Sequence, residues 1–202
     1  MKLEGFYASR FALTLITALS LLLVSCGEES TARPDGYMRI GLPTPAYVQA
    51  PEGLPYTFEM NQSAKWIDKG NGWGDLYYPT LRSRIQLTYK NSQENLEAFV
   101  QEAQNMAMKH TVKASGMRQI QYNNPETEVY GLYYHMSGAA ATTTQFYLTD
   151  STSQFMRGVL YHFSAPNPDS LRPVTNYMRG EIEHLIESLE WKSNNDEDVN
   201  PS

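Results

Sequence analysis

The sequence predicts an α+β fold, in which an antiparallel meander of about six strands carries two main helices, after a cleaved signal peptide. Segments with alternating apolar and polar residues follow one another between residues 56 and 163, and turn residues separate them. One segment of helical period interrupts these strands, and a second follows them. The resulting order β-β-α-β-β-β-β-α favours sequential antiparallel pairing, which needs no crossover helices, over a doubly wound fold.

The N-terminus has the pattern of a bacterial lipoprotein signal. Arg10 precedes an apolar stretch over residues 11–24, which is shorter than the roughly 20 apolar residues of a spanning helix and fits a secretory h-region. Residues 23–26, Leu-Val-Ser-Cys, resemble the lipobox, in which small residues precede the cleavage site and the cysteine thiol receives a diacylglyceryl group. We therefore predict a signal peptide over residues 1–25 and covalent lipid on Cys26, with no other cofactor.

Two other interpretations of this segment are a soluble secreted protein with a free cysteine and a retained N-terminal spanning helix. Cys26 is the only cysteine of the chain, and an odd thiol in an oxidising compartment is usually explained by chemistry done on it. The short apolar stretch argues against the spanning helix. A lipid anchor holds firmly when two or more acyl chains are buried, because each methylene contributes about 0.8 kcal/mol.

Length and charge bound the partners. The precursor has 202 residues, so 202 − 25 leaves 177 in the mature chain, which suits one domain. Lys plus Arg is 16 and Asp plus Glu is 22; removing Lys2, Arg10 and Glu4 leaves 14 and 21, a net charge of −7. Nucleic acid and anionic lipid surfaces are therefore not expected as partners. Aromatic residues make up 12% of the chain, which is enough for a packed core.

The chain divides into a tether, one domain and a tail. Residues 26–36 are polar and contain Pro34 and Gly36, so they are expected to form a flexible tether. Residues 37–192 form a single α+β domain, whose proline-rich start up to residue 55 is expected to run as extended chain over the surface. Residues 193–202 have no apolar period and predict a disordered acidic tail.

The elements of the domain follow from their periods. Alternation predicts strands over residues 56–60 and 84–89. Asn91 and Glu94 form a capping box for a helix, and Gly116 is its expected C-cap. Its apolar stripe comprises Leu96, Phe99, Val100, Ala103, Ala107 and His110.

Four β-rich segments follow this helix. The predicted strands are residues 118–122, 128–136, 144–149 and 155–163, with residues 150–153 as the tightest hairpin loop. A second helix starts near Asp169 and Ser170 and tolerates Pro173 in its first turn. Its expected buried residues are Val174, Met178, Ile182, Leu185 and Leu189.

No motif predicts a catalytic or metal site. His110, His135, His162 and His184 form no H-x-x-x-H or H-E-x-x-H pair, and we interpret them as structural. Glu181 and Glu183 are two positions apart on a helix, so they do not face each other.

A periplasmic hydrolase remains an alternative from the enzyme class. It would use Ser151 or Ser170 with one of the histidines, but the chain lacks the strained G-x-S-x-G turn of such a nucleophile. A small-ligand-binding lipoprotein is a third possibility and would need a deep apolar pocket. The glycine-rich run over residues 69–74 lacks the GK[ST] ending of a phosphate loop, and we interpret it as a flexible loop.

Aromatic residues supply the candidate partner-binding site. Trp66, Trp73, Tyr77 and Tyr78 crowd residues 66–79, which we interpret as a loop, and exposed tryptophan and tyrosine are typical of partner surfaces. Together with the turn at residues 166–173 they would form a recognition surface, and Trp66→Ala would then leave the melting temperature nearly unchanged. The alternative is that most of these residues belong to the core, because strands favour aromatics.

Seven blocks of the mature chain carry a resemblance to a known family. They are residues 73–79, 85–90, 109–114, 129–131, 145–151, 155–161 and 166–174, and the resemblance ends at Leu189-Glu-Trp191. These blocks resemble the GldD family of gliding motility lipoproteins of Bacteroidetes-type bacteria. More faintly, the order of elements is similar to the PsbP/Mog1-like fold, which implies nothing about activity.

The resemblance implies a non-enzymatic lipoprotein of the cell envelope. It would be required for gliding motility and linked to type IX protein secretion. The lipobox agrees with it and predicts anchoring to the inner or the outer membrane by lipid, including palmitate, with the domain facing the periplasm. The implied partners are other envelope proteins of gliding and type IX secretion, with no nucleic acid. The family implies no catalytic residue set.

Overall fold

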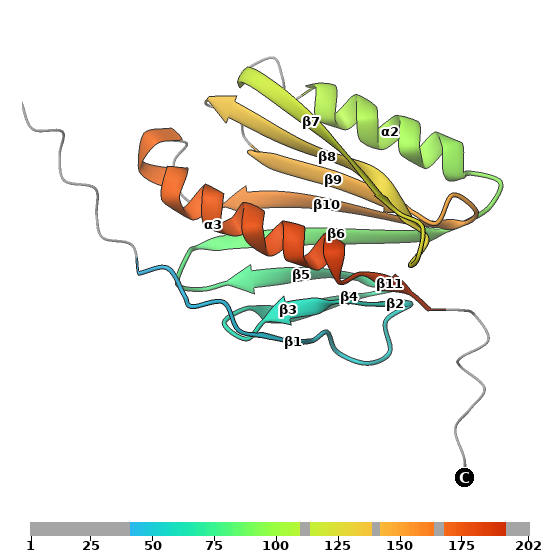
Figure 1. Ribbon diagram of the computed structural model, residues 1–202, viewed down its shortest axis with the longest axis horizontal. Coiled ribbons are helices and arrows are strands. Elements are labelled where there is room, and N and C mark those ends of the chain that lie inside the picture. The colour runs from blue at the N-terminus through green and yellow to red at the C-terminus, as the bar shows by residue number, and fades with distance from the viewer. Residues whose placement is uncertain (1–40, 110–113, 139–141, 164–167, 193–202) are drawn as a thin grey trace, which may run out of the picture. The chain divides into compact units, whose positions relative to one another are not determined.

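The computed structural model describes residues 41–109, 114–138, 142–163 and 168–192, and these form one sheet of seven strands, two small sheets and two helices (Figure 1). In the large sheet all neighbours are antiparallel, in the order β4-β5-β6-β10-β9-β8-β7. Its strands are β4 (Lys65–Gly70), β5 (Trp73–Tyr78), β6 (Ser83–Asn91), β7 (Ala114–Asn124), β8 (Val129–Gly138), β9 (Thr144–Thr149) and β10 (Gln154–His162). The helices are α2 (Leu96–Lys109) and α3 (Pro168–Glu187). The predicted α+β fold class is confirmed.

The two helices pack against opposite faces of the sheet. Side chains alternate between the faces along each strand, as the burial of every second residue of β6 shows. One face packs against α3 and the N-terminal segments in the larger core, whose largest fully buried side chains include Tyr56, Phe58, Leu76, Ile85, Met156 and Met178. The other face packs against α2 through a smaller core of Ala103, Ala107, Tyr134, Met136, Tyr147 and Phe155. All five residues predicted to be buried by the second helix are buried.

Short ribbons from the two ends of the domain lie over the larger core. β1 (Tyr47–Gln49) pairs with β3 (Glu59–Asn61), and β2 (Tyr56–Thr57) pairs with β11 (Glu190–Trp191). The single strand predicted over residues 56–60 is therefore wrong. The chain divides at the fully buried Phe58, and its two halves pair with different partners outside the large sheet.

The loop predicted over residues 66–79 is also wrong, because it is the β4–β5 hairpin. Its two-residue turn is Asn71-Gly72, with φ values of 55° and 74°. These left-handed values are those of a type I′ turn, whose twist matches the flanking strands, and Asn-Gly is its preferred sequence. The glycine-rich run over residues 69–74 is thus part of a hairpin. The large sheet gains β4 and β5 and lacks the strand predicted over residues 56–60, so it has seven strands.

The boundaries of the first helix differ from the prediction. Asn91 ends β6 instead of capping a helix, and Asn95 precedes the first turn, where its carbonyl accepts the N–H of Phe99 at 3.0 Å. Gly116 lies in β7 rather than at a C-cap. By contrast, the predicted hairpin loop at residues 150–153 is confirmed: one carboxylate oxygen of Asp150 accepts three successive backbone N–H groups at 2.8–2.9 Å.

The signal peptide over residues 1–25, the tether over residues 26–36, Cys26 and the tail over residues 193–202 lie outside the described residues. They stay predictions. Within the residues that the structure describes, no helix combines the length and the apolar character needed to cross a membrane.

Candidate functional site

The four aromatic residues of the predicted partner surface lie on the β4–β5 hairpin but on two different faces. Tyr78 is 2% exposed and belongs to the larger core. Trp66 is half-buried, packs against that core and covers Gly74, where a Cβ atom would collide with the indole ring. Trp73 and Tyr77 alternate with these residues and point to the other face, where Trp73 is 38% exposed. Partner binding by Trp73 and Tyr77 stays a prediction, and Trp66 and Tyr78 contribute to the core.

The turn predicted as the second part of that surface is only partly described. Residues 164–167 lie outside the described residues, and α3 already begins at Pro168. Pro173 lies inside this helix.

A buried carboxylate joins three elements of the larger core. Glu181 on α3 is 4% exposed. Its Oε1 accepts hydrogen bonds from the Tyr47 hydroxyl of β1 at 3.3 Å and from Asn61 Nδ2 of β3 at 3.1 Å. Its Oε2 accepts the Tyr78 hydroxyl of β5 at 3.0 Å. Asn61 Nδ2 also donates to the Tyr177 hydroxyl, one turn earlier on α3, at 3.0 Å.

All direct donors to this carboxylate are neutral. No lysine, arginine or histidine in the described part of the chain forms an ion pair with Glu181. Burial, followed by the negative charge of Glu181, raises the pKa of Tyr47, Tyr78 and Tyr177, so these hydroxyls keep their protons at neutral pH. A buried charge is costly unless hydrogen bonds replace its water shell, and bonds to charged groups contribute about 1.5–3 kcal/mol each.

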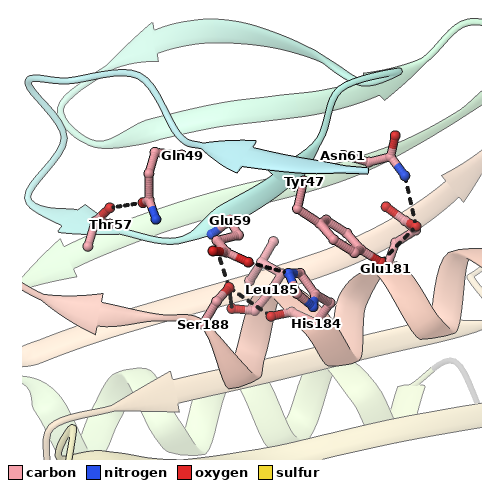
Figure 2. Close-up of polar contacts among 9 residues, drawn as sticks. All are labelled: Tyr47, Gln49, Thr57, Glu59, Asn61, Glu181, His184, Leu185 and Ser188. Atoms are coloured by element: carbon pink, nitrogen blue, oxygen red, sulfur yellow. Dashed lines mark hydrogen bonds and ion pairs between the residues drawn. The ribbon is translucent and has the colours of Figure 1, made fainter. Parts of the chain in front are cut away.

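The next two turns of α3 extend this cluster (Figure 2). The Tyr47 ring stacks on the His184 ring with centroids 3.5 Å apart and planes at 17°. His184 Nε2 lies 2.8 Å from Glu59 Oε2. The Ser188 hydroxyl accepts the backbone N–H of Glu59 at 3.0 Å and donates to the His184 carbonyl at 2.8 Å.

These contacts give the cluster a structural role that the sequence did not reveal. Glu181 and His184 of α3, together with Ser188 directly after its end, face the β1–β3 ribbon. Both oxygens of the buried carboxylate already accept hydrogen bonds. We call this set the ribbon lock: Tyr47, Glu59, Asn61, Tyr78, Glu181, His184 and Ser188. It holds the first described strand to the last helix.

A second polar cluster brings a serine hydroxyl into contact with a histidine ring. His162 Nδ1 lies 2.7 Å from Ser83 Oγ, and His162 Nε2 lies 3.1 Å from Thr175 Oγ1. Ser83 is fully buried and its hydroxyl donates to the Leu81 carbonyl at 2.9 Å. The Ser83 hydroxyl therefore accepts a hydrogen bond from His162 Nδ1–H, and its buried position gives a substrate no access. A nucleophilic serine would instead be exposed and would donate its proton to the histidine.

The serines of the hydrolase alternative lie elsewhere. Ser151 occupies the β9–β10 turn with a φ of 65°, and its backbone N–H donates to Thr149 Oγ1 at 3.0 Å. Ser170 is exposed in the first turn of α3. Neither position is a strained strand-to-helix turn, so the geometry adds no support to that alternative.

His135 occupies a site that disfavours its charged form. Its Nε2 is buried without a hydrogen-bond partner among the described residues, and its ring meets Tyr133 edge-on at 4.2 Å. Burial, and then the positive charges of Arg179 and Arg118, lower its pKa to about 4. Burial and Arg179 also lower the pKa of His162. His110 lies outside the described residues.

Neither metals nor ligands are suggested by the described residues. They contain no group of three or more His, Cys, Asp or Glu side chains placed to hold a metal ion. One hollow of about 560 Å³ lies over β7, β8 and β9 and is lined by polar residues such as Gln121 and Asn123 together with Tyr130 and Tyr147. This mixed lining is not the apolar pocket that a small-ligand-binding function would need.

Together these features define an antiparallel α+β domain with a ribbon locked to its last helix. The family model described as gliding motility lipoprotein GldD matches residues 27–191, so the chain belongs to this family and has a role in gliding motility. The resemblance stated from the sequence blocks is confirmed. A lipoprotein of this kind is anchored to a membrane of the cell envelope. No curated protein gives a significant match.

Because Trp66 packs on the core, Trp66→Ala should lower the melting temperature, contrary to the expectation from the sequence. Trp66→Ala empties the space above Gly74 and beside Phe58, so we expect a loss of about 2 kcal/mol or more and a lower melting temperature. Ile67→Ala is the matched control, because Ile67 is the next residue and is 46% exposed. Circular dichroism melts of the purified lipoprotein measure both. Equal melting temperatures for Trp66→Ala and wild type would contradict the core position.

Acid should destabilise the domain through its histidines. The folded pKa of His135 lies near 4, below its ordinary value of 6.5, so the unfolded chain binds the proton first as the pH falls. The stabilising contribution is full above pH 6.5 and is lost between pH 6.5 and 4. His135→Phe should therefore flatten the fall of the melting temperature between pH 7 and 5. An unchanged slope in this variant would refute the role of His135.

Proposed function

We propose that this lipoprotein acts without catalysis, by binding other envelope proteins of the gliding and type IX secretion machinery. The observation that carries the proposal is the family match over residues 27–191, which spans nearly the whole mature chain. The serine–histidine contact at Ser83 and the hydrogen-bonded carboxylate of Glu181 fit this view, because both side chains are buried and bonded to other parts of the fold.

The anchor in this proposal is lipid, including palmitate, on Cys26, with the domain in the periplasm. Support comes from the lipobox at residues 23–26 and from the lipoprotein description of the family. Cys26 and Tyr47 of β1 are 47 − 26 = 21 positions apart. A fully extended chain of that length spans at most roughly 70 Å. The domain can therefore meet partners well beyond the membrane surface.

Gene replacement in the host bacterium tests the proposal. We expect deletion to abolish spreading and to reduce secretion of type IX cargo, and the wild-type gene to restore both.

Cys26→Ser removes the thiol that takes the lipid, so the precursor should stay uncleaved and free of labelled palmitate. Ser25→Gly is the matched control, because it keeps a small residue before the cleavage site.

Either of two results would contradict this account. Palmitate labelling that survives in Cys26→Ser would exclude the proposed lipid site. Normal spreading and secretion in the deletion strain would exclude the proposed role.

A further inference from the structure

One part of the sheet is left open by the described elements. α2 packs on the face that carries Tyr134, Tyr147 and Phe155, so it covers β8, β9 and the neighbouring end of β10. The strands that α2 contacts most are β10 and β9, whereas β4 and β5 lie beyond β6 at one edge of the sheet (Figure 1). No described helix packs on this face of β4, β5 and the first half of β6.

The strand register gives the residues of this open face. Lys65, Tyr77, Arg84 and Tyr161 form one row across β4, β5, β6 and β10. Ile67, Asp75 and Gln86 form the next row. We define the open face by these two rows together with Lys69, Arg157 and Phe163, which adjoin them.

The open face is positively charged although the chain is acidic. It carries the cations Lys65, Lys69, Arg84 and Arg157 and the single carboxylate of Asp75, so its net charge is 4 − 1 = +3. The chain as a whole has a net charge of −6. Asp75 is 2% exposed and lies beneath two of these cations, with its oxygens 2.8 Å from Lys69 Nζ and 3.2 Å from Arg84 Nη1. One carboxylate for two cations leaves positive charge at the surface.

Apolar and aromatic groups separate these charges. Ile67 is 46% exposed and Phe163 is 43% exposed. The Arg84 guanidinium lies 5.2 Å from the Phe163 ring and 5.5 Å from the Tyr161 ring, and Tyr77 meets Phe163 edge-on. Asp75 and the rings thus hold the guanidinium in place, and a fixed guanidinium binds carboxylates well because its donors form a rigid fork. Arginine and aromatic side chains are also enriched at protein interfaces.

We propose that the open face docks an acidic segment of a protein partner, a specification that rests on the proposed function. Carboxylates of the segment meet Lys65, Lys69 and Arg84, and its apolar residues meet Ile67, Tyr77 and Phe163. Charge complementarity selects an acidic occupant. The rows favour an extended chain, because neighbouring strands lie about 4.8 Å apart and offer alternating charged and apolar positions. A membrane is disfavoured because the acidic chain as a whole is repelled by anionic lipid.

Photo-crosslinking in the host bacterium tests the inference on the full lipoprotein. A benzophenone amino acid replaces Ile67, which is exposed, and mass spectrometry sequences the crosslinked peptides. We expect peptides from another envelope protein in which Asp and Glu outnumber Lys and Arg. Adding Lys65→Glu should lower the yield about fivefold, because it reverses a charge at the rim of the interface. Arg118→Glu is the matched control, since Arg118 is exposed on β7 at the opposite edge of the sheet.

Several results would overturn the inference. They are crosslinks to lipid, to glycan or to residues 193–202 of the same chain, a captured segment without acidic excess, and equal yields in the Lys65→Glu and Arg118→Glu strains. Circular dichroism melts of both variants check that the domain is folded. If crosslinking fails while deletion still abolishes spreading, the open face is not the docking surface and the proposed function stands. Normal spreading after deletion defeats the proposed function itself.

Discussion

The arrangement of this domain depends on one buried carboxylate, Glu181, which forms no ion pair with any residue that the structure describes. Inside the larger core the Glu181 oxygens would lack hydrogen-bond partners unless Tyr47, Asn61 and Tyr78 all pointed their donors at them. Those three residues come from β1, β3 and β5. The hydrogen bonds to this one side chain of α3 therefore fix the positions of β1, β3 and the end of β5 together.

The two faces of the large sheet differ in how much of them is covered. On its own face, the N-terminal ribbons and α3 bury the aromatic residues Tyr56, Phe58 and Tyr78. On the opposite face α2 covers β8, β9 and the end of β10. Charged and aromatic groups therefore stay accessible over β4, β5 and β6. We propose that the covered face keeps the domain rigid and that the open face binds the partner.

The sequence predicted those elements whose signals are local. The apolar spacing of Val174, Met178 and Ile182 indicated the buried side of α3, because the period of a helix can be recognised within a short stretch of sequence. The Asp150 turn was predictable for the same reason. The Asn71-Gly72 turn carried an equally local signal, but the three glycines around it were interpreted as flexibility and the hairpin was missed.

Long-range features were not predictable in this way. Glu181 and Glu183 look alike in the sequence, yet Glu181 is buried and Glu183 is exposed. The difference is made by donors that lie more than 100 positions away in the chain, such as Asn61 and Tyr78. Likewise, nothing in residues 66–78 states which aromatic side chains face the core. That follows only from the pairing of β4 with β5 and from the alternation of the strands.

Hydrogen–deuterium exchange of the Glu181→Ala lipoprotein is the most direct test of the ribbon lock. Removing the carboxylate leaves the Tyr78 hydroxyl buried without its acceptor and takes away the bonds that tie Tyr47 and Asn61 to α3 residue 181. The amides of β1 and β3 should therefore exchange much faster than in wild type, while β8 and β9 keep their protection. Glu183→Ala, on the exposed side of the same helix, should match wild type. Unchanged protection of β1 and β3 in Glu181→Ala would contradict the account.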